Sequence, residues 1–258
     1  MNQNPLTRRT SIAALAAPAP DTPQPVPMCL RLRKLPATIL GIYGPGKNIL
    51  PERMRYLEPE AAASYLGLEA TSHRLRVSDM WRSADSSLSA SLEKRGVQRP
   101  AFSGHNFGLS IDLDVRDCMD RLHMSKRALD DFMASQGWYC HRKDHVLDAE
   151  SWHFNFLGVG EEGQRYLTKS ARAQSTAPAL EAKIQELYGA DLDLSALQVQ
   201  AALRRAHLYT GDLDGIPGPM SRRALLSFQR AWDLPATGVA DSVTQRTLAF
   251  VTAEVEIV

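Results

Sequence analysis

Two short segments of the chain contain histidines close to carboxylates. The packing of a hydrophobic core does not require polar residues of these types. The first runs from Ser103 to Asp112 and carries His105 in a turn flanked by glycines, and the second runs from Glu150 to His153. Histidine and carboxylate side chains are the ligands of catalytic zinc sites, which take three ligands from the protein and leave a fourth position to water. His105, Asp112 and His153 could form such a set.

Alternating polarity predicts how these residues come together. Over residues 109–115, large apolar residues alternate with Ser and Asp, so Asp112 should lie on the polar face of a strand. Residues 152–157 repeat the pattern with aromatic residues and place His153 on the polar face of a second strand. If the strands pair, the histidines and the aspartate converge. The same alternation would turn Glu150 away, so we expect Glu150 in the turn before the strand, within reach of water at the metal.

Each of these residues also has an ordinary structural explanation. A single histidine more often lies on the surface or forms hydrogen bonds in a core, and Asp112 alone could cap a turn or pair with an arginine. Asp114 shares the face of Asp112 and could replace it as a ligand or support it, although the spacing favours Asp112. His141 and His145 have the spacing of ligands on a helix, but their neighbours predict an exposed loop rather than a second metal site.

Taken together, the segments resemble the Ser-x-His-x-x-Gly-x-Ala-x-Asp and Glu-x-x-His motifs of the zinc D-Ala-D-Ala carboxypeptidase and L-Ala-D-Glu endopeptidase family, relatives of the lysostaphin and hedgehog fold. Both motifs occur in the family's order and separation, and the resemblance covers about residues 75–157. The resemblance implies that His105, Asp112 and His153 bind Zn²⁺ and that Glu150 is the general base.

The same resemblance points upstream, to a strand end where the family has Tyr-Arg-Ser. Here the stretch reads Met80-Trp81-Arg82-Ser83, so the resemblance makes Arg82 the candidate for holding a substrate carboxylate and the developing oxyanion. A solvated surface arginine is the alternative explanation. Ser110 stands where the family usually has alanine, which exchanges one small residue of the site lining for another.

Helical and strand patterns mix across residues 28–167, which predicts an α+β peptidase domain with a small antiparallel sheet and flanking helices. Helices are expected over residues 59–68, 88–95 and 125–136. The last of these begins at a serine N-cap and is closed by a glycine. A further strand is expected over residues 75–81.

An internal repeat marks the C-terminal region. Residues 215–225 recur at a constant offset as residues 238–248, and each copy is a turn followed by a helix start. Over about residues 195–250 the pattern resembles the three-helix peptidoglycan-binding domain of cell-wall hydrolases, although a small bundle for self-association would need the same residues. The composition of residues 168–178 predicts a linker. Residues 179–258 are therefore expected to form an all-α peptidoglycan-binding domain.

Composition limits the class of protein and its partners. The 258 residues, 44% hydrophobic and 23% charged, are typical of a folded protein with two compact units. Thirty Lys+Arg against 29 Asp+Glu give a formal net charge of +1, without the basic excess typical of nucleic-acid binding. No apolar run reaches the roughly 20 residues that span a bilayer, so an integral membrane protein is not expected. The sequence leaves open whether Cys118 and Cys140 pair.

The first 27 residues are rich in proline and predict a flexible arm. Within it, Arg8 and Arg9 precede a short apolar stretch that resembles a truncated twin-arginine export signal, which Pro18 interrupts. The arm therefore leaves export to the periplasm open as a route to the cell wall.

These features together predict a zinc peptidase that cuts the stem peptides of bacterial peptidoglycan. The layout is that of a bacteriophage endolysin, which would stay in the host cytoplasm until lysis releases it to the wall. Two alternatives remain, a D-Ala-D-Ala carboxypeptidase of wall maintenance and a catalytically inert wall-binding protein. We expect a monomer whose partner is peptidoglycan.

Overall fold

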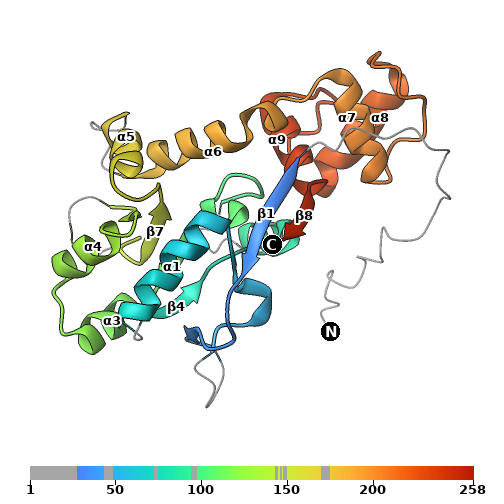
Figure 1. Ribbon diagram of the computed structural model, residues 1–258. Helices are drawn as coiled ribbons and strands as arrows, with labels where there is room; N and C mark the ends of the chain where they lie inside the picture. The colour runs from blue at the N-terminus through green and yellow to red at the C-terminus, as the bar shows by residue number, and fades with distance from the viewer. Residues whose placement is uncertain are drawn as a thin grey trace, which may run out of the picture. The chain divides into compact units, whose positions relative to one another are not determined.

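The computed structural model describes residues 28–43, 49–72, 75–93, 98–142, 145, 147, 150–169 and 175–258 (Figure 1). The proline-rich arm and residues 170–174 of the expected linker lie outside these residues. The described residues form two compact units, one from residues 28–192 and 253–258 and the other from residues 193–252. No helix of the described residues is long and apolar enough to cross a membrane.

A five-stranded mixed sheet forms the centre of the first unit. Its strands follow the order β2 (Leu40–Gly41), β4 (Arg76–Asp79), β5 (Ser110–Leu113), β7 (His153–Phe156) and β6 (Trp138–Cys140). The β2–β4 pair is parallel, whereas the other three pairs are antiparallel. The expected pairing of the two alternating segments is confirmed as β5 against β7. The register places Asp112 opposite His153.

Helices cover the apolar face of this sheet. Ser64 of α1 (Pro59–Ser72) accepts a hydrogen bond from the Trp138 indole, and Lys126 of α4 (Lys126–Ala134) lies over the Phe154 ring. Helix α3 (Val115–Leu122) contacts β4, where the Cys118 thiol accepts a hydrogen bond from a backbone N–H. The opposite, polar face of β5 and β7 is thereby left to carry the candidate site.

The expected helices are present, with shifted ends. The helix expected over residues 88–95 begins earlier, as α2 (Ala84–Leu92), because the Ser83 side chain accepts a hydrogen bond from the backbone of Ser86 and caps it. The expected serine N-cap of α4 is observed at Ser125. Short 3-10 turns, η2 (Glu52–Met54) and η3 (Gly104–Phe107), connect other elements.

Cys118 and Cys140 do not form a disulfide in the part of the chain that the structure describes. Cys118 and Cys140 are both buried, free thiols, and Cys29 is an exposed free thiol. Burial raises the pKa of Cys140 and raises that of Cys118 to about 12. Neither buried thiol is therefore poised to act as a nucleophile near neutral pH.

The boundary between the units differs from the one expected at residues 168–178. Helix α6 (Ala177–Leu192) packs in the first unit beside α5 (Glu161–Lys169). Lys183 of α6 is 2% exposed, lies 2.8 Å from Glu162 and sits over the Phe156 ring. The buried Lys183 and the apolar side of α6 hold this helix to the first unit, so α6 does not belong to the C-terminal domain.

The last residues of the chain also belong to the first unit. Strand β8 (Glu254–Ile257) pairs in parallel with β1 (Cys29–Lys34), which pairs on its other edge with β3 (Tyr56–Leu57) (Figure 1). The expectation of an all-α end is wrong for these residues, since a strand partner more than two hundred residues away leaves no local pattern. The helical domain is therefore inserted in sequence between α6 and β8.

The second unit is helical, as expected, and consists of α7 (Ala196–Arg205), α8 (Pro219–Ala231) and α9 (Ser242–Val251). The internal repeat has a structural counterpart, because a buried glutamine holds each turn. The Gln200 side chain accepts the Gly215 N–H at 2.8 Å, and the Gln229 side chain accepts the Gly238 N–H at 2.8 Å. Both glycines have φ of +71°, which favours glycine at these turns.

Candidate metal centre

His105 is held by the turn η3, just before β5. The Ser103 side chain caps this turn by accepting the His105 N–H. A Cβ atom on Gly104 would lie 1.9 Å from the Ser110 hydroxyl oxygen, so glycine is required there. Gly108 ends the turn with φ of +67°. The glycines of this motif therefore let the turn fold tightly against β5, and His105 is buried to 1% exposure.

Three side chains converge on the polar face of β5 and β7. Nε2 of His105 lies 3.2 Å from Oδ1 of Asp112 and 3.3 Å from Nδ1 of His153. Nδ1 of His153 lies 2.7 Å from Oδ1 of Asp112. Their ligand atoms all lie within 4.8 Å of one another, the spacing of a candidate metal site. The convergence expected from strand alternation is thus observed.

Neighbouring acceptors select which nitrogen of each neutral imidazole carries the hydrogen. Nδ1 of His105 lies 2.5 Å from the Met80 carbonyl, which can only accept, so this nitrogen carries the hydrogen. Nε2 of His153 lies 2.9 Å from Oδ1 of Asn155, an oxygen that also accepts from Ser110. When both rings are neutral, as metal binding requires, they therefore turn lone pairs toward Asp112. Such carbonyl and amide partners are the usual orienting groups behind metal-bound histidines.

The donor set fits a zinc ion. Two imidazole nitrogens and one carboxylate oxygen face one another, and a cation among them removes the repulsion between their lone pairs. Burial by itself would raise the pKa of Asp112, but His105 and His153 outweigh it and hold the pKa below its usual range. For His153, burial lowers the pKa, but the hydrogen bond to Asp112 and the charge of Asp112 raise it by more. The net effect is a raised pKa for His153. The aspartate thus stays negative at the point where a cation would bind.

Glu150 lies in the turn before β7, as expected. Its backbone adopts φ of +71°, its carbonyl accepts the His153 N–H at 3.1 Å, and its side chain is exposed. Burial lowers the pKa of His141, while the charge of Glu150 acts in the opposite direction on both His141 and His153. The Glu150 carboxylate therefore lies within electrostatic reach of the cluster and remains open to solvent.

Arg82 lies beside the cluster and is not a solvated surface arginine. Its guanidinium donates from Nε to Asp79 at 2.5 Å and from Nη2 to the outer oxygen of Asp112 at 3.4 Å, and its side chain is 17% exposed. A backbone hydrogen bond connects the segment that contains Arg82 to the turn that contains His105, because the Arg82 N–H donates to the His105 carbonyl at 3.1 Å. Asp79 was not expected from the sequence, although a carboxylate three residues before an arginine is a visible signal.

The remaining sequence candidates are not part of the three-residue cluster. Asp114 caps α3 by accepting the Asp117 N–H, and His145 is bonded to Asp130 of α4 at 2.8 Å. His141 lies beside the cluster, with its ring 5.5 Å from that of His153 in an edge-to-face arrangement. Among the described residues, the one group with metal-binding spacing is the cluster of His105, Asp112 and His153.

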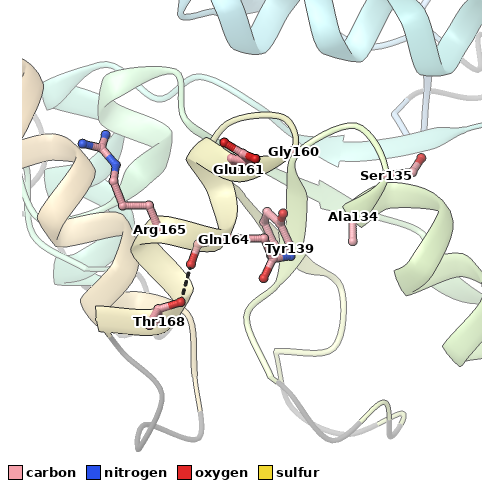
Figure 2. Close-up of a pocket in the computed structure, with 8 residues that line it drawn as sticks. All are labelled: Ala134, Ser135, Tyr139, Gly160, Glu161, Gln164, Arg165 and Thr168. Atoms are coloured by element: carbon pink, nitrogen blue, oxygen red, sulfur yellow. Dashed lines mark hydrogen bonds between the residues drawn. The ribbon is translucent and has the colours of Figure 1, made fainter.

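A separate pocket of 580 Å³ opens between the end of α4, strand β6 and helix α5 (Figure 2). Its lining comprises Ala134, Ser135, Tyr139, Gly160, Glu161, Gln164, Arg165 and Thr168. Tyr139 pairs with Asn155 across β6 and β7, so the pocket lies one strand away from the residue that orients His153. None of the candidate ligands lines this pocket, which is therefore not part of the metal centre.

Comparisons with known proteins support the helical C-terminal unit directly. Residues 195–248 match the family model described as "Putative peptidoglycan binding domain". No curated protein matches the chain. A solved structure described as the LdcB LD-carboxypeptidase is similar at 17% identity, with a TM-score of 0.38, over 55% of this chain and 74% of that chain. A TM-score of this size does not establish a shared fold, so the metal centre rests on its own geometry.

Replacing Asn155 with alanine tests how His153 is oriented. The change removes the acceptor for Nε2, and we expect zinc affinity to fall by roughly 10- to 100-fold, the usual effect of losing such an orienting group. Competition with a chelating dye of known affinity measures this. Asn155→Asp keeps an acceptor and should bind more tightly than Asn155→Ala. Wild-type affinity in a folded Asn155→Ala protein would show that Asn155 does not orient the ligand.

Proposed function

We propose that this chain is a zinc-dependent peptidase that hydrolyses stem-peptide bonds of bacterial peptidoglycan. The observation that carries the proposal is the buried convergence of His105, Asp112 and His153, with the ring nitrogens of both histidines oriented by neighbouring acceptors. The peptidoglycan-binding match over residues 195–248 supports the choice of substrate. A metal site alone would suit many hydrolases, and the second unit narrows the choice to the cell wall.

The chain's own residues divide the work of hydrolysis. His105, Asp112 and His153 would hold the zinc ion, whose Lewis acidity makes water acidic near neutral pH and polarises a peptide carbonyl. Glu150, exposed beside His153, accepts a proton from the attacking water at its carboxylate and returns it to the leaving amine. Arg82 donates a hydrogen bond to Oδ2 of Asp112, which leaves Oδ1 of Asp112 facing the histidines. No side-chain nucleophile is needed.

The inserted helical unit gives the peptidase a means of staying on its insoluble substrate. This pairing of a wall-binding unit with a peptidase supports a lytic role of the endolysin kind as part of the proposal. Two other functions would leave different products. A D-Ala-D-Ala carboxypeptidase would release terminal D-Ala and keep the cross-links, and an inert wall-binding protein would bind and release nothing.

Digestion of purified sacculi, with the fragments identified by mass, tests the proposal. We expect soluble fragments with new termini inside the stem peptide, loss of activity with a chelator, and recovery when zinc is added back. Release of D-Ala alone would favour the carboxypeptidase. Binding to sacculi without any product, in zinc-loaded protein, would overturn the proposed activity.

A further inference from the structure

Arg82 is held by two carboxylates at once. Its Nε donates to Asp79 and its Nη2 donates to Asp112, so one edge of the guanidinium is divided between them. An arginine that recognises a free carboxylate usually offers such an edge as a fork of two parallel donors. In this chain that edge is already occupied.

Asp79 is not free to release Arg82. The residue is 9% exposed, and its second oxygen, Oδ1, is buried without a hydrogen-bond partner among the described residues. A buried carboxylate with one unsatisfied oxygen depends on its remaining ionic partner, and breaking such a pair leaves an uncompensated charge. A substrate carboxylate would therefore have to compete with Asp79 at a large cost.

The Asp79 carboxylate also cancels the charge that Arg82 would offer to an anionic ligand. The pair is close and shielded from solvent, because the side chains of Arg82 and Asp79 are 17% and 13% exposed. A neutral carbonyl oxygen needs only one hydrogen-bond donor, and Nη1 of Arg82 has no hydrogen-bond partner among the described residues.

On the basis of the proposed function, we infer that Asp79 occupies Arg82 and thereby prevents it from binding a substrate carboxylate. The site therefore takes peptides in which the residue after the scissile bond is itself amide-linked. The substrate class is thus an internal or cross-linking peptide bond of the wall. Asp79 acts as a specificity-determining residue that positions Arg82 and cancels its charge.

A matched pair of substrates tests this inference on the full chain. We would prepare an N-acetylated peptide that ends one residue beyond the bond cut in sacculi, as the free acid and as the C-terminal amide. The zinc-loaded wild-type protein should hydrolyse the amide with kcat/KM at least equal to that for the acid. A preference for the acid of roughly tenfold or more, the size of a productive charge contact, would overturn the inference.

The Asp79→Asn variant supplies the second arm. Asparagine keeps an acceptor for Arg82 but removes the charge, so we expect the acid-to-amide ratio of kcat/KM to rise by roughly tenfold. Asp85→Asn, an exposed neighbour in α2, is the matched control and should leave the ratio unchanged. An unchanged ratio in Asp79→Asn protein that still binds zinc would also overturn the inference. If Asp79→Asn does not fold, the wild-type ratio decides. If the wild type cuts neither peptides nor sacculi, the proposed function fails instead.

Discussion

Replacing His153 with alanine should remove bound zinc and lower peptide hydrolysis by roughly 10³-fold or more. His153 is one of three converging ligands, and its Nδ1 is the atom nearest to Asp112, at 2.7 Å. Two ligands hold zinc weakly, and without the metal several kcal/mol of charge stabilisation are lost. Elemental analysis and a peptide assay on the same purified sample give both values. Thermal stability should also fall relative to the zinc-loaded wild type, because a ligand bound only by the folded state stabilises it.

His123→Asn is the matched control for that variant. His123 is exposed and ends α3 with φ of +53°, a conformation that asparagine tolerates well. This variant should keep its zinc and its activity. Full zinc content in His153→Ala, with normal hydrolysis, would mean that the cluster is an ordinary hydrogen-bond network of the core.

Glu150→Gln should separate proton transfer from metal binding. Glutamine keeps the size and polarity of the side chain but cannot accept the proton, so hydrolysis should fall by roughly 10²-fold or more while zinc content stays near that of the wild type. The fold should be unaffected because Glu150 is exposed and its backbone bond to His153 is retained. Glu161→Gln, exposed at the start of α5, is the control and should behave as wild type.

Glu150→Gln and His153→Ala test different roles in the same assay. Loss of zinc in Glu150→Gln comparable to that in His153→Ala would make Glu150 a ligand. Near-normal turnover in Glu150→Gln would make it a bystander. Either outcome contradicts the mechanism, since the proposal assigns Glu150 to the proton and His153 to the metal.

Much of the candidate site could be predicted because strand alternation is a local signal. In β5 and β7, buried apolar residues alternate with polar ones, so the sequence alone places Asp112 and His153 on one face. The glycines beside His105 were visible as a turn. Alternation within each strand does not show whether the two strands pair. The spacing of the motifs, which resembles that of a known family, favours pairing.

The missing parts depend on contacts between distant residues. Asn155 orients His153 from the same strand, but its role is defined only by Ser110 and Thr176 beside it. Helix α6 reads from sequence as the start of the second domain, yet a buried lysine and an apolar side commit it to the first. Strand β8 needs its partner β1 before it can be recognised. A chain cut near residue 167 would lose both elements and could not test whether the peptidase folds alone.

Anomalous diffraction at the zinc absorption edge, from crystals of the zinc-loaded protein, tests the central claim most directly. We predict one strong peak about 2.0–2.2 Å from Nε2 of His105, Nδ1 of His153 and Oδ1 of Asp112. A zinc-loaded crystal with no peak among these atoms, or with its peak held by other residues, would contradict it.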